Sequence, residues 1–189
     1  MLYPLKFIPV YKQYIWGGRN LLSLGKKLPE GIVAESWELC CHPDGMSVVS
    51  NGRYSGRTLR SLLDEYGYKI VGNTYKEECK DFPLMVKFID ANEKLSVQVH
   101  PDDAYAMANE GEPGKNEMWY VINAKPGARL ILGLCPGVTK EVFKEAVSRN
   151  SVDKCLNSVM VKPGDFFYIH AGLVHAIGEG ILLAEIQQN

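Results

Sequence analysis

The chain has 189 residues, and its 21 lysines and arginines nearly balance 22 aspartates and glutamates, for a formal net charge of −1. This balance argues against a nucleic-acid-binding protein that depends on a basic surface. Hydrophobic residues make up 46% of the sequence, as in an ordinary globular protein, and no apolar run approaches the roughly 20 residues that span a bilayer. We therefore expect one cytoplasmic domain over residues 1–189, with no nucleic-acid or membrane partner.

The five cysteines are odd in number and include no C-x-x-C pair. The pattern therefore predicts neither a disulfide framework nor a thiolate zinc site. We expect reduced and mostly buried thiols. The cysteines are Cys40, Cys41, Cys79, Cys135 and Cys155.

Short apolar runs separated by glycine and proline are typical of an all-β domain with many short strands. In chain order, the expected strands are Ser36–Cys40, Met46–Val49, Leu84–Ile89, Leu95–Val99, Met118–Ile122, Arg129–Leu132, Val159–Val161, Phe166–Ile169 and Leu182–Ile186. Three short helices are expected among them, the first capped by Thr58, the second a turn after Pro101, and the third capped by Thr139. Because strands dominate, the sequence favours a sandwich or barrel over a βαβ fold.

The segment 95–101 alternates strictly between apolar and polar residues. The alternation places Leu95, Val97 and Val99 on one face, and Ser96, Gln98 and His100 on the other. An edge strand with a solvated polar face explains this pattern as well as a functional site does.

A second segment repeats the arrangement, because Lys115, Glu117 and Trp119 share one face of an expected strand. If Glu117 faces the same interior as Gln98 and His100, a carboxylate joins an imidazole and an amide oxygen. The alternative is a surface carboxylate paired with Lys115, and such exposed pairs are common and weak.

A third segment, 162–178, contains two turns and two of the four histidines, His170 and His175. Histidine and glutamate on short strands beside tight turns suit a metal site better than three unrelated structural residues. The candidate ligands, two nitrogen and two oxygen donors, are Gln98, His100, Glu117 and His175. This donor set suits Zn²⁺, and Mn²⁺, Fe²⁺ and Co²⁺ are compatible with it. His170 competes with Gln98 for the fourth position, or supports a ligand from behind.

These three segments resemble the two motifs of the cupin superfamily, and more closely the type I mannose-6-phosphate isomerases of the short bacterial class. The resemblance rests on Gln98-Val-His100-Pro-Asp, on Gly114-Lys-Asn-Glu117 and on Gly172-Leu-Val-His175. Further stretches that carry it include residues 14–18, 35–39 and 82–90. The resemblance thus covers the whole chain.

The resemblance implies a mainly β cupin jelly-roll barrel with a few short helices. It also implies an isomerase that interconverts mannose 6-phosphate and fructose 6-phosphate through a cis-enediol, with one zinc ion per chain. Carried over residue by residue, it makes Gln98, His100, Glu117 and His175 the metal ligands and places Ser96 and Lys87 near the substrate, where they would recognise the phosphate. It makes Lys115 an acid/base, although a lysine that only orients Glu117 fits the sequence nearly as well.

The sequence departs from the family pattern in two places. His170 stands where the second motif often has proline, and the chain ends before a segment whose arginine the family uses in its active site. We therefore expect a C-terminally shortened domain whose exposed edges favour self-association. A metal-binding cupin that holds a sugar phosphate without turning it over is the alternative function. An Fe²⁺ oxygenase fits less well, because such sites usually contain more histidine.

Overall fold

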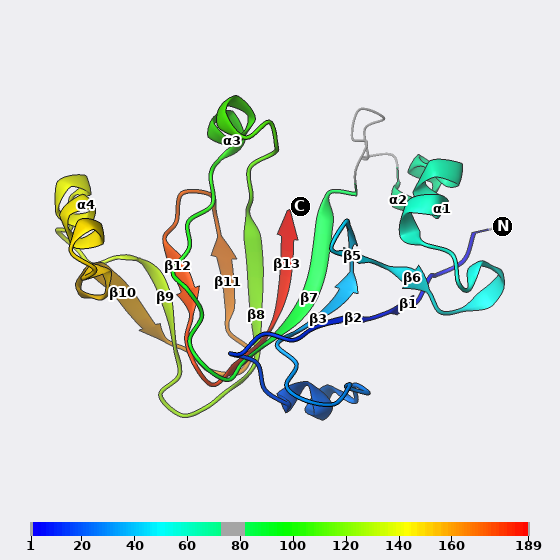
Figure 1. The fold of residues 1–189 in the computed structure, drawn as a ribbon, viewed down its shortest axis with the longest axis horizontal. Helices are drawn as coiled ribbons and strands as arrows, with labels where there is room; N and C mark the ends of the chain where they lie inside the picture. The colour runs from blue at the N-terminus through cyan, green and yellow to red at the C-terminus, as the bar shows by residue number, and fades with distance from the viewer. Residues whose placement is uncertain (1, 73–81, 189) are drawn as a thin grey trace.

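The computed structural model describes residues 2–72 and 82–188, and strands dominate both ranges. A six-stranded antiparallel sheet occupies the centre of the molecule (Figure 1). In spatial order its strands are β11 (Phe166–Ile169), β8 (Glu117–Ala124), β13 (Ile181–Gln188), β7 (Leu84–Ala91), β3 (Glu35–Leu39) and β2 (Val10–Lys12). The strand nearest the C-terminus, β13, thus lies in the interior of the sheet between β8 and β7.

A three-stranded sheet packs against one face of the large sheet. Its strands, in spatial order, are β10 (Leu156–Met160), β9 (Arg129–Leu134) and β12 (His175–Ile177). Two short pairs complete the strands: β1 (Phe7–Ile8) with β6 (Val48–Val49), and β4 (Cys41–His42) with β5 (Gly45–Met46). The prediction of a mainly β cupin jelly-roll fold with a few short helices is confirmed.

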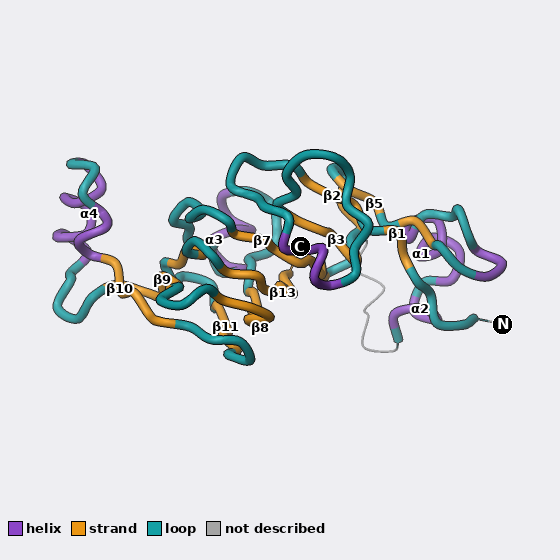
Figure 2. The backbone as a smooth tube through the Cα atoms, turned by 90° about the horizontal axis from the view of Figure 1, so that it is seen from below, coloured by secondary structure: helices purple, strands orange, loops and turns teal. Residues whose placement is uncertain are grey.

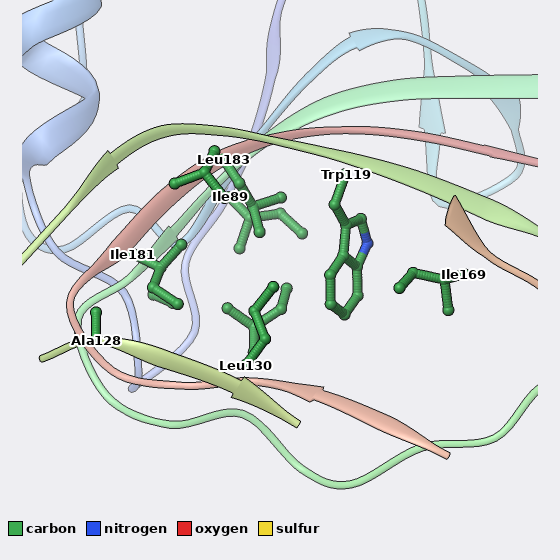
Figure 3. Close-up of a cluster of buried hydrophobic side chains, with 10 residues drawn as sticks. Ile89, Trp119, Ala128, Leu130, Ile169, Ile181 and Leu183 are labelled. Carbon is green, nitrogen blue, oxygen red and sulfur yellow. The ribbon is translucent and has the colours of Figure 1, made fainter. Parts of the chain in front are cut away.

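The main core lies between the two sheets, as Figure 3 shows. The large sheet contributes Ile89 and Leu183, which are 2% and 0% exposed, and β9 of the small sheet contributes Leu130, which is fully buried. Burying each such side chain stabilises the fold by about 1.5–3 kcal/mol. This core holds the two sheets face to face.

Four α-helices occur in the described residues: α1 (Leu59–Tyr66), α2 (Tyr68–Val71), α3 (Asp103–Asn109) and α4 (Lys140–Ser148). Short 3₁₀ helices cover Asn20–Leu24, Gly52–Tyr54 and Val152–Cys155. Seen from below, α4 and the α1–α2 pair lie at opposite ends of an elongated molecule (Figure 2).

All three predicted helices are present, and Thr58 and Thr139 cap two of them as predicted. Thr58 accepts a hydrogen bond from the Ser61 amide at 3.1 Å, and Thr139 caps α4 in the same way. Asp102 caps α3 with its carboxylate. These side chains satisfy amide groups that the first helical turn leaves without a partner.

The predicted strand Leu95–Val99 is wrong. This segment makes only one isolated bridge, between Gln98 and His175, and Val97 and Val99 are 42% and 57% exposed. Its one neighbour, β12, is three residues long and cannot support a full ladder. The predicted strand Met46–Val49 is also divided, because β5 and β6 pair with different partners.

Among the cysteines of the described ranges, Cys40, Cys41 and Cys155 are buried as expected. Cys79 lies outside the described residues. Among the described helices, none has both the length and the apolar character needed to cross a membrane.

Candidate metal centre

The inward face of the large sheet changes from apolar to polar along three rows of paired residues. Residues paired across antiparallel strands share a face, as do residues two apart along one strand. The rows, read from β7 through β13 to β8, are Ile89–Leu183–Val121, Lys87–Glu185–Trp119 and Met85–Gln187–Glu117. The sheet therefore carries charged and polar groups directly beside its apolar core.

Three side chains from different parts of the fold converge next to these rows. Glu117 begins β8 of the large sheet, His175 begins β12 of the small sheet, and His100 precedes α3. One ligand atom from each lies within 4.8 Å of the others. The Nε2 atom of His100 is 3.0 Å from Glu117 Oε1, and that of His175 is 3.8 Å from Glu117 Oε2. These separations are close to the roughly 3.4 Å between neighbouring ligands of a tetrahedral zinc ion.

The two imidazoles point nitrogen atoms at this centre that have no hydrogen-bond partner among the described residues. Both atoms, His100 Nε2 and His175 Nε2, are buried, and the short approach of His100 to Glu117 lacks hydrogen-bond geometry. Buried polar atoms in folded proteins almost always have a hydrogen-bond partner. Two neighbouring buried nitrogens without one are therefore typical of a metal site. The residues present therefore fit a divalent cation.

The ring of His175 is oriented by its other nitrogen. Nδ1 lies 2.8 Å from the carbonyl oxygen of Leu173, so it donates there and leaves Nε2 as the lone-pair acceptor. Burial lowers the pKa of His175, which favours the neutral ring that coordinates metals. The backbone thus fixes both the direction and the tautomer of this ligand.

Glu117 is the carboxylate at the centre, and its side chain is 3% exposed. Burial by itself would raise the pKa of Glu117, but His100 and Lys115 outweigh it and lower the pKa to about 2. The carboxylate is therefore ionised at neutral pH and available as an anionic ligand.

Gln98 reaches the same centre through the backbone. Gln98 and His175 exchange two amide-to-carbonyl hydrogen bonds, each 2.8 Å long. Such a directly opposed pair places both side chains on one face, and both residues line a cavity of about 60 Å³ beside Glu117. Sequence alternation therefore predicted the correct side for Gln98, although the strand itself is absent.

Lys115 is brought to the centre by a close backbone approach. A Cβ atom on Gly114 would lie 2.4 Å from the carbonyl carbon of Asp102, so only glycine lets the chain pass α3 at this point. The Lys115 amide then donates to Pro101, and its Nζ lies 2.8 Å from Glu117 Oε1. The predicted shared face of Lys115 and Glu117 is present.

Lys87 lies deeper in the same cavity, between two carboxylates that the sequence analysis missed. Its Nζ is 2.9 Å from Glu185 and 3.8 Å from Glu35. Burial by itself would lower the pKa of Lys87, but these two carboxylates outweigh it and raise the pKa. Each glutamate also accepts an indole hydrogen bond, Glu185 from Trp119 and Glu35 from Trp37. The sequence pattern could have revealed Glu185, because it lies two residues after Leu183 and therefore on the same, core-facing side of β13.

The remaining predicted residues separate into two groups. Ser96 lines the small cavity, and its hydroxyl accepts a 3.4 Å hydrogen bond from Gln98. His170 is exposed, its Nδ1 lies 2.8 Å from the Ala171 carbonyl, and it is outside the His100, Glu117 and His175 cluster. The structure therefore does not bring His170 to the centre.

Comparison with known proteins places this chain in a family. Residues 4–128 match the sequence profile of the phosphomannose isomerase type I catalytic domain. The chain belongs to the type I phosphomannose isomerase family. Mannose-6-phosphate isomerase ManA of Bacillus subtilis is 46% identical over 187 residues, which cover 98% of this chain and 58% of that relative. The mannose-6-phosphate isomerase of Streptococcus mutans is 44% identical over 93% of this chain and 54% of its own.

Solved structures of family members share the fold. The crystal structure of the Bacillus subtilis mannose 6-phosphate isomerase superposes with a TM-score of 0.89 at 38% identity, over 98% of this chain and 58% of that one. A variant of the Salmonella typhimurium phosphomannose isomerase matches with a TM-score of 0.77 at 16% identity, over 98% and 68%, which shows the fold alone. This chain thus spans a little over half the length of the two relatives named above.

Proposed function

We propose that this chain carries the metal-binding site of an aldose–ketose isomerase that interconverts mannose 6-phosphate and fructose 6-phosphate through a cis-enediol. One observation carries the proposal: in a member of this family, His100 and His175 aim unpaired buried nitrogens at the ionised carboxylate of Glu117. In this proposal residues 1–189 act as a single cupin-like unit.

We further propose that Gln98, His100, Glu117 and His175 hold one Zn²⁺ ion per chain. Two imidazoles, a carboxylate and an amide oxygen suit zinc with room for substrate, and the same donors accept other divalent metals. A bound cation would supply Lewis-acid polarisation of the sugar oxygens.

The chain's own residues would handle the proton. The reaction moves a proton between C1 and C2 of the sugar and needs an acid/base within hydrogen-bond reach of the substrate. We assign this role to Lys115, which lines the cavity and whose Nζ lies 2.8 Å from Glu117. Ser96 and Lys87 would contact the substrate from the cavity wall, and the two carboxylates beside Lys87 favour a sugar oxygen over the phosphate as its partner.

A coupled assay with fructose 6-phosphate tests the function directly. Isomerase activity in the metal-loaded chain should disappear after treatment with a chelator and return when zinc is added. Activity that survives in metal-free protein would contradict the metal-dependent mechanism.

A binding function without turnover is the second candidate. It requires only the candidate ligands and the polar cavity beside them, which the described residues bring together. If the metal-loaded chain binds fructose 6-phosphate in a calorimeter but gives no product in the coupled assay, this second function holds.

We also propose that a second copy of the chain can pair with β11, an edge strand of the large sheet. Its outer face exposes Phe166 and Tyr168, which are 57% and 61% accessible, and an open edge next to exposed aromatics favours association. Sedimentation velocity should detect a concentration-dependent dimer that Phe166→Lys weakens.

A further inference from the structure

Gln187 is a buried polar residue that the fold does not use. It lies on β13, is 7% exposed, and its Oε1 atom has no hydrogen-bond partner among the described residues. An unpaired buried acceptor destabilises the folded state, because it has lost its hydrogen bonds to water. An apolar residue would pack equally well here without this cost. The amide therefore indicates that a bound ligand supplies the missing hydrogen-bond partner.

The position of Gln187 relates it to the metal centre. It is paired with Glu117 across the sheet, so both side chains point to the same interior face. It also lines a cavity of about 660 Å³ that borders His100 and Lys115. Lys115 lines both this larger cavity and the small one, whereas Lys87 lines the small cavity and not the larger one.

The charges around Gln187 indicate what it can bind. Glu117 and Lys115 form an ion pair at 2.8 Å, so their charges already offset each other. The cavity is also lined by one further cation and two further carboxylates, Arg60, Glu110 and Glu112. Its charged groups therefore carry no excess of positive charge. A primary amide offers both an acceptor and donors but no net charge. This combination selects a neutral group that can donate and accept, such as an alcohol, over a phosphate.

We infer that Gln187 is a positioning residue that hydrogen-bonds a hydroxyl group of the sugar-phosphate substrate in this larger cavity. The inference rests on the proposed function, since it requires a sugar phosphate at the metal centre. The hydroxyl donates to Oε1 and thereby satisfies the buried acceptor.

Calorimetric titration of the zinc-loaded chain with fructose 6-phosphate tests the inference. Gln187→Met removes the amide while keeping the length of the side chain, and should weaken binding roughly tenfold, the upper range for one neutral hydrogen bond. The matched control is Gln13→Met, which changes an exposed glutamine that donates to the Glu30 carbonyl and lines neither cavity, and it should leave the affinity unchanged. Both variants should retain one zinc per chain.

Two further readouts separate positioning from a structural role. The melting temperature of Gln187→Met should equal or exceed that of the wild type, because the change removes an unpaired acceptor. A series of monodeoxy sugar 6-phosphates, each lacking one hydroxyl group, identifies the hydroxyl that Gln187 contacts. The compound without that hydroxyl should bind the wild type more weakly than the parent sugar does. Gln187→Met should bind this compound and the parent sugar equally well.

Equal affinity of wild type and Gln187→Met would overturn the inference while leaving the proposed function intact. The inference would also be overturned if Gln187→Met lowered the melting temperature and if, for every deoxy sugar, the losses of affinity from the substitution and from the missing hydroxyl simply added. Gln187 would then have a structural role. If the wild-type chain binds no sugar phosphate, the proposed function fails and the inference fails with it.

Discussion

At the scale of single residues, the two unpaired imidazole nitrogens lead to the most specific prediction, which concerns metal binding. We predict that His100→Ala raises the dissociation constant for zinc by at least about 100-fold, because even the loss of a residue that supports a ligand costs 10–100-fold. Metal analysis after dialysis measures the effect. His170→Ala is the control, since His170 is exposed and outside the cluster. Full zinc content in His100→Ala, or its loss in His170→Ala, would refute the ligand assignment.

Substitution of Lys115 tests whether this residue is an acid/base or only orients Glu117. If it moves the proton, Lys115→Met should lower kcat by about 10²–10⁴-fold while the zinc content stays at one per chain. Loss of zinc in parallel with loss of activity would assign Lys115 to holding Glu117 through their 2.8 Å ion pair.

Lys87 is the buried cation between two buried carboxylates. Removing it leaves Glu185 and Glu35 without a counter-charge, so Lys87→Met should lower the free energy of unfolding by about 3–5 kcal/mol, measured by urea denaturation. Lys94→Met is the control, because Lys94 is 76% exposed and its partner is 3.8 Å away, and it should change stability by less than about 1 kcal/mol.

The pH dependence of this difference follows from the raised pKa of Lys87. A group whose pKa is raised by folding contributes fully below its unfolded value, about 10.4 for lysine, and loses that contribution as the pH rises through the higher folded value. The gap between wild type and Lys87→Met should therefore be constant near neutral pH and shrink only above about pH 10.4. A gap that shrinks between pH 7 and 9 would contradict the assignment.

Sequence reasoning singled out His100, Glu117 and His175, which the structure brings together, because histidine and glutamate stand out in apolar strands. It did not find Glu35 and Glu185, although Glu185 has the phase of a core residue, because charged residues on alternating strands are usually assigned to the solvated face. Only the register across β7, β13 and β8 shows that Lys87, Glu185 and Trp119 form one buried row.

At the scale of elements, the local sequence was sufficient to predict where a helix begins when a single capping side chain determines that boundary. Thr58 caps α1 through a single hydrogen bond to Ser61, so Thr58→Ala should cost about 1 kcal/mol of unfolding free energy. Thr58→Ser keeps the hydroxyl and should retain most of the stability in the same thermal denaturation experiment. Equal losses in both variants would show that the methyl group, not the cap, stabilises this end of α1.

Local signals failed where pairing depends on a distant partner. Residues 95–99 alternate like a strand, but their neighbour β12 offers only three residues and also pairs with β9. Strands β1, β2 and β4 were not predicted because each is two or three residues long. Such short strands form through tertiary contacts, which no local periodicity encodes.

At the scale of the whole molecule, the candidate metal centre forms only when the two sheets are packed together. Glu117 comes from the large sheet and His175 from the small one, and His100 comes from the segment that leads into α3. The unfolded chain cannot hold these groups in place, so metal binding stabilises the folded state.

Zinc should therefore raise the melting temperature of the chain. At a free zinc concentration of 100 times Kd the stabilisation is about 2.7 kcal/mol, which corresponds to roughly 5–10 °C for a protein of this size. Differential scanning calorimetry measures the shift, and Glu117→Gln, which keeps the shape but removes the anionic ligand, should abolish most of it. An equal shift in that variant would place the ion elsewhere.

The central claim is that one divalent cation binds between His100, Glu117 and His175. Anomalous diffraction at the zinc edge from crystals grown with zinc tests it most directly. We expect one strong peak per chain, about 2.0–2.2 Å from both Nε2 atoms and from a Glu117 carboxylate oxygen. No peak at this position, or a peak held by other side chains alone, would contradict it.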